Sequence, residues 1–175
     1  MWLWRWTKVF GACGIVSVGL AETPGIVYWR SMTTTVRAAK EEDQPTIRRM
    51  IRAAKLNPMS LNWANFLIAE DAGTVVGTGQ VKTHRDGSRE LASIAVVPSR
   101  QGKGIGSSIV SALLERHGDG VLHLTCERKN EGYYERFGFR RITRKEFPRY
   151  FARLLPFVNA VARLGRTEII VMRRG

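Results

Sequence analysis

One stretch of the chain, residues 90–107, combines a strand, a glycine-rich turn and the start of a helix. Residues 91–97 form a largely apolar run that suits a buried strand, and Pro98 cannot extend a strand's hydrogen-bond ladder. Glycines follow at positions 102, 104 and 106, immediately before a segment with helical apolar spacing. The amides that open a helix have no partner within it and lie at the positive end of its dipole. The stretch therefore predicts a strand, a loop that suits a pyrophosphate, and a helix.

The spacing of the glycines can be compared with that of two known kinds of phosphate-binding loop. A P-loop needs a lysine after its last glycine, whereas Lys103 precedes Gly104 and Gly106. The dinucleotide fingerprint Gly-x-Gly-x-x-Gly has Ser107 where its third glycine should stand, although Glu127 follows at about the distance of a ribose-binding acid. A Rossmann-like nucleotide enzyme therefore stays open as an alternative.

A third loop pattern, Gln/Arg-x-x-Gly-x-Gly/Ala, is filled by Gln101, Gly104 and Gly106. The loop thereby resembles the acyl-CoA loop of the GNAT superfamily of N-acyltransferases. Further along, residues 130–139 look like that family's Asn...Tyr-Glu-x-x-Gly-Phe segment. Two motifs in the family's order and distance make the resemblance specific, and it covers residues 36–142.

The second motif departs from the family in one respect. Asn130 stands closer to Tyr134 than the family usually has it. We therefore expect the helix that carries Tyr134 to be short.

The resemblance implies an α/β (α+β) fold with a mixed, mostly antiparallel central sheet flanked by helices, in which two central parallel strands splay apart. The sequence pattern agrees with that fold. Turn residues separate three predicted strands of an antiparallel meander, at 63–70, 74–83 and 89–97. A predicted helix over 104–117 leads to a strand at 121–126, and such a helical crossover makes the strands on either side of it parallel.

Two further helices are expected, one near each end of this unit. Residues 44–54 carry apolar side chains at helical spacing, with Asp43 in position to cap the helix. Residues 148–164 read as a basic amphipathic helix that is broken near Pro156 and followed by a closing strand over 167–172. This helix could line the acceptor site, lie on a membrane, or cover the sheet with its apolar face.

Gly77 and Gly79 interrupt the middle strand of the predicted meander. Glycines at such places mark a bulge or the close approach of another segment. Packing and catalysis explain them equally well.

The resemblance also implies roles for individual residues. A backbone N–H around Ala95 to Val97 would bond to the thioester carbonyl of acyl-CoA. Tyr134 would protonate the leaving thiolate, and Glu90 would accept the proton of the attacking amine. Without those roles, Tyr134 is an aromatic packing residue and Glu90 is a surface charge on a strand. The residues expected to bind acetyl-CoA are Ile94, Ala95, Val96, Val97, Gln101, Gly102, Lys103, Gly104, Ile105, Gly106, Ser107 and Asn130.

The sequence is therefore interpreted as an acyl-CoA N-acyltransferase that moves an acetyl group from acetyl-CoA to a primary amine by direct attack. The acceptor is expected to be a small molecule or a peptide, and nucleic acid is not the expected partner. Two alternatives remain. One is the Rossmann-like nucleotide enzyme, and the other is a non-catalytic module of the acyl-CoA fold that binds RNA or a membrane through its basic tail.

The charged, cysteine and histidine residues of the sequence bear on its binding partners, its location in the cell and metal binding. Its 28 Lys and Arg against 15 Asp and Glu give a net charge of +13, which attracts polyanions, acidic substrates or a membrane surface, although a solvated basic face explains it as well. Cys13 and Cys126 offer neither metal spacing nor a disulfide framework, so we expect a reducing, cytoplasmic location. His84, His117 and His123 lack ligand spacing, and we expect no metal site. Of the three, His84 has the best chance of touching substrate, because its strand adjoins the central one.

Residues 1–31 carry none of the motifs, and we expect a single catalytic domain over 32–175. The extension combines tryptophans and basic residues with an uncharged run over 9–21. It can be read as a membrane anchor, as a cleaved signal peptide, or as a segment ahead of a natural start at Met32. Export conflicts with the use of acetyl-CoA, which is a cytosolic metabolite.

Overall fold

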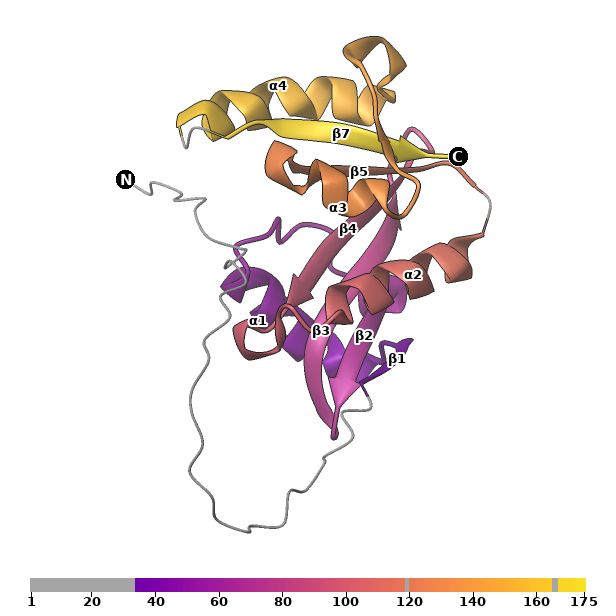
Figure 1. The fold of residues 1–175 in the computed structure, drawn as a ribbon, viewed down its shortest axis with the longest axis vertical. Coiled ribbons are helices and arrows are strands. Elements are labelled where there is room, and N and C mark those ends of the chain that lie inside the picture. The colour runs from indigo at the N-terminus through magenta and orange to yellow at the C-terminus, as the bar shows by residue number, and fades with distance from the viewer. Residues whose placement is uncertain (1–33, 119, 165–166) are drawn as a thin grey trace, which may run out of the picture.

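The computed structural model describes residues 34–118, 120–164 and 167–175, so the expectations for residues 1–31 lie outside the described part of the chain. Within that part, seven strands form one sheet in the order β1-β2-β3-β4-β5-β7-β6 (Figure 1). The strands are β1 (Thr35–Ala38), β2 (Phe66–Asp71), β3 (Thr74–Thr83), β4 (Arg89–Val96), β5 (Leu122–Glu127), β6 (Arg140–Arg141) and β7 (Ile169–Arg174). The helices are α1 (Gln44–Ala53), α2 (Ile105–His117), α3 (Glu131–Glu135) and α4 (Arg149–Leu164).

One pair of neighbouring strands in the described sheet is parallel, and the other pairs are antiparallel. The parallel pair is β4 and β5, which share a single register position, Glu90 with His123. Figure 1 shows β4 turning away from β5. The predicted mixed, mostly antiparallel sheet with splayed central strands is confirmed. The same topology excludes the Rossmann-like alternative, because that fold needs a largely parallel sheet.

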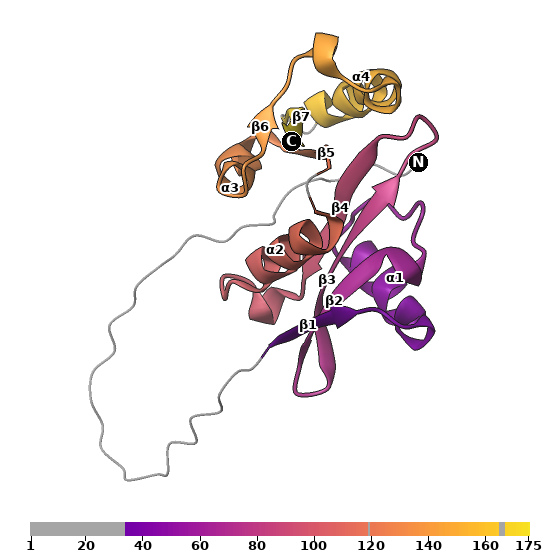
Figure 2. The same cartoon turned by 90° about the vertical axis from the view of Figure 1, so that its right-hand side faces the viewer.

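Helices cover both faces of the sheet. Figure 2 shows α2 and α3 on one side and α1 and α4 on the other. The core beneath α2 includes Ile109 and Leu113, and the core beneath α1 includes Ile47 and Ile51. In α1 these two residues and Met50 recur at the predicted helical spacing. The helix α3 has five residues and is therefore short, as the spacing of the second motif predicted.

Most predicted strands lie within a residue or two of those observed, which is the usual uncertainty of element ends. The strand expected from Trp63 begins at Phe66 instead, because Trp63–Asn65 form a turn of 3₁₀ helix. The Asn62 side chain accepts a hydrogen bond from the Ala64 amide at 3.1 Å, and this bond fixes the turn before the strand.

The side chain of Asp43 does not cap α1, contrary to expectation. Its carboxylate accepts hydrogen bonds from the Arg37 side chain at 2.9 Å and from the Lys40 amide at 2.7 Å. Burial alone would raise the pKa of this carboxyl, but these hydrogen bonds outweigh burial and lower it. A short 3₁₀ turn before α1 directs the carboxylate back toward β1, so it anchors that strand instead of the helix.

The C-terminal helix α4 is continuous through Pro156, where the sequence predicted a break. Pro156 lies on the exposed side of α4, where water can hydrate the carbonyl that loses its helical donor. The apolar side packs against the sheet, where buried Phe151 and half-buried Leu155 cluster with Val171 of β7. Of the three expected roles for this helix, the contacts favour covering the sheet.

Gly77 and Gly79 of β3 are explained by the close approach of α2. A Cβ built on Gly77 would lie 2.7 Å from Ile109 Cδ1. One built on Gly79 would lie 2.6 Å from Ile109 Cγ2 and 2.6 Å from Ile94 Cδ1. Packing therefore requires both glycines.

Replacing Gly79 with alanine is expected to lower the free energy of unfolding by about 1–3 kcal/mol, because the added methyl group overpacks the contact with α2. Denaturant unfolding measures the change. Gly132→Ala is a matched control, since a Cβ on helical Gly132 would have no neighbour nearer than 3.9 Å. That control should be neutral or slightly stabilising. Equal stability of the two variants would contradict the close packing.

Candidate active site

The loop after β4 is shaped by two glycines in the left-handed region. Gly102 has a φ of 76° and Gly104 a φ of 79°, which residues with a side chain rarely adopt. A Cβ on either glycine would meet nothing within 4 Å. The backbone conformation, and not crowding, therefore requires these glycines.

The turn leaves the first amides of α2 without acceptors. Gly104 is the N-cap residue, and its carbonyl accepts the first helical hydrogen bond, from the Ser108 amide at 3.0 Å. The amides of residues 104–107 have no backbone acceptor among the described residues. They lie at the positive end of a 13-residue helix, where a pyrophosphate can accept their hydrogen bonds.

Gly106 lies where α3 approaches the loop closely. A Cβ on Gly106 would lie 3.3 Å from the Tyr133 hydroxyl, and that hydroxyl is 3.4 Å from the Ser107 hydroxyl. The Arg136 guanidinium lies over the Tyr133 ring, 4.9 Å from its centroid. Sequence reasoning missed Tyr133, which borders the loop; the doubled tyrosine Tyr133-Tyr134 was the available signal.

Gln101 ties the loop back to β4, because its Nε2 donates to the Val96 carbonyl at 2.9 Å. The Val97 amide donates to the Val76 carbonyl of β3, also at 2.9 Å. Since amides alternate in direction along a strand, those of Val96 and Ile94 point away from β3 and toward the gap beside β5. Val96 lies within the expected range for a carbonyl-binding amide, around Ala95 to Val97, and Ile94 lies one residue before that range.

A bulge lies where β3 and β4 pair at Gly79, as one of the two readings of Gly77 and Gly79 predicted, and the extra residue of the bulge is on β4. Ser93 has a φ of 59°, and the register between β3 and β4 shifts between Thr78 and Gln80. The Thr78 hydroxyl donates to the Ser93 carbonyl at 3.2 Å, and Gln80 Nε2 donates to the Ser93 hydroxyl at 2.9 Å. A bulge bends its strand, which accounts for the divergence of β4 from β5.

Glu90 lies inside the protein, with an exposed fraction of 5%. Its Oε2 is 2.9 Å from His84 Nε2 and 3.2 Å from Lys82 Nζ, and its Oε1 accepts from the Thr125 hydroxyl at 3.2 Å. Burial alone would raise the pKa of Glu90, but the His84 hydrogen bond and the Lys82 charge outweigh burial and lower it. The alternative reading of Glu90 as a surface charge is wrong, because Glu90 is a buried, ionised group at the start of the gap.

Tyr134 projects from α3 into a cluster of aromatic rings. Its ring meets those of Tyr133 and Phe139 edge to face, at centroid distances of 5.0 and 6.2 Å. Burial raises the pKa of the Tyr134 phenol, so the hydroxyl stays protonated at neutral pH. Packing accounts for the ring, while the hydroxyl keeps a proton that it can donate.

The remaining predicted acetyl-CoA contacts differ in their surroundings. The Ile105 side chain is buried in the core, which leaves its amide as the group that can meet a ligand. Lys103 is exposed in the loop. Asn130 is the N-cap residue of α3, and its side chain makes no capping hydrogen bond.

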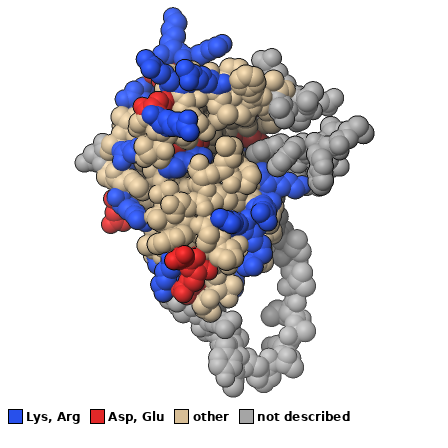
Figure 3. Space-filling model, turned by 180° about the vertical axis from the view of Figure 1, so that it is seen from behind, with Lys and Arg blue, Asp and Glu red and all other residues tan. Residues whose placement is uncertain are grey.

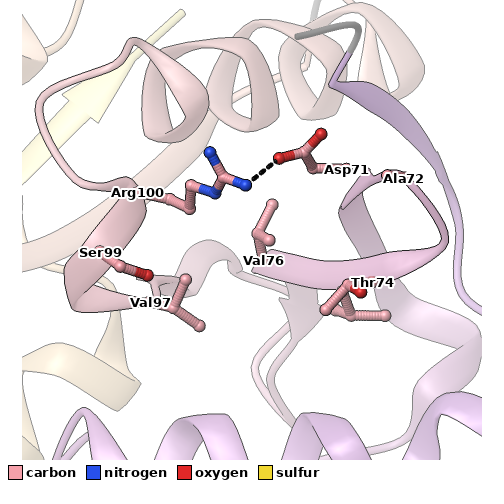
Figure 4. A pocket seen from close by; sticks show the side chains of 8 residues that line it. Asp71, Ala72, Thr74, Val76, Val97, Ser99 and Arg100 are labelled. Carbon is pink, nitrogen blue, oxygen red and sulfur yellow. Dashed lines mark ion pairs between the residues drawn. The ribbon is translucent and has the colours of Figure 1, made fainter. Parts of the chain in front are cut away.

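An ion pair connects the glycine loop to the β2–β3 turn. Arg100 Nη2 lies 2.6 Å from Asp71 Oδ2, and both residues line a cavity of about 420 Å³ (Figure 4). The other lining residues are Ala72, Thr74, Val75, Val76, Val97 and Ser99. Sequence reasoning missed this pair, because its partners come from turns that are far apart in the chain.

Basic side chains gather on the outside of the molecule as well. Arg48, Arg49 and Arg52 of α1 line a groove of about 700 Å³ together with Trp63. Figure 3 shows Lys and Arg side chains grouped at several places on the back of the molecule, with fewer Asp and Glu. Such a surface suits acidic ligands.

The described ranges hold neither a cluster of metal ligands nor a helix that could span a membrane. Three or more His, Cys, Asp or Glu side chains do not come together there as metal ligands would. The helices of that part of the chain are too short or too polar to cross a membrane.

Residues 62–141 match the model of the acetyltransferase (GNAT) domain family. That segment runs from the turn before β2 to β6 and contains the glycine loop, Glu90 and Tyr134. This part of the chain therefore resembles a GNAT acetyltransferase domain, and it amounts to somewhat less than half of the sequence. No curated protein sequence matches the chain.

Solved structures share the fold at low sequence identity. N-acetylglutamate synthase from Neisseria gonorrhoeae, complexed with coenzyme A and N-acetyl-glutamate, has a TM-score of 0.63 and 23% identity; the match covers 81% of this chain and 34% of that one. Rv2747 from Mycobacterium tuberculosis, in complex with CoA and NLQ, has a TM-score of 0.62 and 23% identity over 80% and 98% of the two chains. The ribosomal-protein-S18-alanine N-acetyltransferase from Escherichia coli has a TM-score of 0.58 and 22% identity over 81% and 93%. This chain thus spans about a third of the synthase and nearly all of the other two.

Proposed function

We propose that the protein transfers the acetyl group of acetyl-CoA directly to a primary amine, and that residues 32–175 are the catalytic unit. The observation that carries the proposal is the gap between β4 and β5. It has the unpartnered amides of residues 104–107 beyond the end of β4 and the ionised Glu90 near the start of that strand. An extended acyl-CoA can lie along the free edge of β4 between these two groups.

The pyrophosphate of acetyl-CoA suits the amides of the loop, and the pantetheine arm then runs back along β4. The thioester carbonyl stands at the far end of that arm. The Ile94 amide, farther from the loop than Val96 and next to the bulge at Ser93, therefore suits the carbonyl as its hydrogen-bond donor. The Val96 amide suits the arm itself.

The chemistry needs one group that takes a proton and one that gives a proton. A neutral amine attacks the thioester carbon, a C–N bond forms, and Glu90 accepts the proton that the amine loses. The C–S bond then breaks, and the leaving thiolate takes a proton from the Tyr134 hydroxyl. Solvent restores the proton to Tyr134 afterwards.

The names of two similar structures suggest which acceptors to test first. One is an N-acetylglutamate synthase, and another acetylates an alanine of a ribosomal protein. We therefore propose α-amines, either of free amino acids or of peptide N-termini, as the first acceptors to try, followed by polyamines and aminoglycosides. The use of acetyl-CoA makes the cytoplasm the proposed location.

Thermal-shift measurements with acetyl-CoA, NAD(P) and a short RNA test the cosubstrate. Acetyl-CoA at about 100 times its dissociation constant should raise the melting temperature by about 5–10 °C, because it binds only the native state. Mass spectrometry with the amine panel then detects the acetylated product. A shift with RNA alone, and no product from any amine, would contradict the proposal in favour of a non-catalytic module.

A further inference from the structure

The carboxylate of Glu90 is held unevenly, because its two oxygens have different partners. Lys82 Nζ and His84 Nε2 both contact Oε2, at 3.2 and 2.9 Å. Oε1 has one protein partner among the described residues, the Thr125 hydroxyl of β5 at 3.2 Å. Thr125 lies two positions beyond His123, where the pairing of β5 with β4 has already ended. Oε1 therefore faces the start of the gap.

Lys82, His84 and Glu90 form a buried cluster, so the charges in it strongly affect one another. The side chains of Lys82, His84 and Glu90 have exposed fractions of 10%, 9% and 7%. Taking charges out of water is costly unless partners compensate them, and an opposite charge at this distance favours the ionised carboxylate. Lys82 stands directly across from Glu90 in the register of β3 and β4. The His84 hydrogen bond and the Lys82 charge together therefore keep Glu90 ionised inside the protein.

The imidazole of His84 is fixed by the C-terminal helix. Its ring stacks on Tyr150, the second residue of α4, with the centroids 3.4 Å apart and the planes inclined by 13°. Phe151 meets the same ring edge to face at 5.7 Å. The Tyr150 amide donates to Asp86 at 2.7 Å, which joins the start of α4 to the β3–β4 turn. The helix thus sets the position from which His84 holds Glu90.

We propose that Lys82 and His84 are positioning residues that hold Oε2 of Glu90 and so leave Oε1, beside Thr125, to accept the proton of the acceptor amine. This inference rests on the proposed acetyl transfer. The amine proton passes to Oε1 as the C–N bond forms, and neither Lys82 nor His84 accepts it. The titratable or charged groups around Glu90 are Lys82 on β3, His84 and Asp86 in the β3–β4 turn, His123 on β5 and Tyr150 on α4.

The first test replaces Lys82 with methionine, which removes the charge and keeps a similar length. Loss of the nearby cation should raise the pKa of the Glu90 carboxyl. Because the carboxylate is the active form, the acid limb of the kcat/KM profile should move to higher pH, so activity is lost at low pH and recovered at high pH. Lys82→Arg should bring the limb back toward its wild-type position. Acetyl-CoA affinity should change little in either variant.

The second test asks whether the effect passes through Glu90. In a Glu90→Gln background, Lys82→Met should leave the pH profile where Glu90→Gln alone puts it. Lys129→Met is the matched control, because Lys129 also pairs with a carboxylate, that of Glu127, but is exposed. It should leave the acid limb unmoved. His84→Gln, which keeps a donor, should retain more kcat than His84→Leu.

A third experiment measures the ionisation of the Glu90 carboxyl directly and does not depend on turnover. The ¹³C resonance of the Glu90 carboxyl, assigned through Glu90→Gln, should titrate at higher pH in Lys82→Met than in the wild-type protein. If that shift occurs while the kcat/KM profile stays unmoved, the inference is overturned together with the role of Glu90 as proton acceptor, while the proposed acetyl transfer stands. An unshifted carboxyl also overturns the inference. If acetyl-CoA binds but no amine is acetylated by the wild-type protein, the proposed function itself fails, and the inference fails with it.

Discussion

Replacing Gly104 with aspartate is expected to weaken acetyl-CoA binding by at least ~100-fold, which corresponds to about 2.8 kcal/mol. Two effects act together. The φ of 79° at Gly104 strains any residue with a side chain, and a carboxylate there repels the pyrophosphate. Isothermal titration calorimetry measures the affinity. The fold should persist, because a Cβ at this position would meet nothing within 4 Å.

Gly104→Asn separates the two effects. Asparagine has the size of aspartate without its charge, and it tolerates a positive φ better than most residues. This variant should therefore lose much less affinity than Gly104→Asp. If both variants bind acetyl-CoA as the wild-type protein does, the pyrophosphate does not lie on this loop. If both lose the same affinity, strain accounts for the loss and the charge does not.

Replacing Tyr134 with phenylalanine is expected to lower kcat by roughly tenfold or more, because the leaving thiolate loses its proton donor. The ring and its contacts with Tyr133 and Phe139 are kept, so stability and acetyl-CoA affinity should change little. Steady-state kinetics across the pH range measures the effect. The loss should be largest where the free thiol would stay protonated and should shrink at high pH, where a thiolate leaves more readily.

Tyr133→Phe is the comparison for that variant. The Tyr133 hydroxyl borders the glycine loop beside Ser107, so its loss should appear in acetyl-CoA affinity and not in kcat. Wild-type turnover in Tyr134→Phe at every pH would mean that the thiolate leaves without help. Tyr134 would then be a packing residue only.

The glycine loop could be predicted because its signals are local. Pro98 ends a ladder, Gly102 and Gly104 permit a left-handed turn, and the apolar spacing after them marks α2. The parallel direction of β4 and β5 followed from the same stretch, since a helical crossover joins them. In each case a few neighbouring residues determine the structure.

The surroundings of Glu90 could not be predicted in the same way, because they depend on contacts between distant segments. Lys82 reaches Glu90 through the register of β3 and β4, and Tyr150 reaches His84 only after α4 folds back over the sheet. The bulge at Ser93 likewise depends on the register in which β3 pairs with β4. Local propensity also misjudged Pro156, whose exposed position lets α4 continue.

The central claim is that acetyl-CoA lies in the gap between β4 and β5 with its pyrophosphate on the first turn of α2. The most direct test is a titration of the ¹⁵N-labelled protein with acetyl-CoA, followed through its amide resonances. The amides of residues 102–107 should shift most, together with those of Ile94 and Val96, while the basic groove of α1 stays unchanged. Shifts confined to α1 and Trp63, with the loop amides unmoved, would contradict the claim.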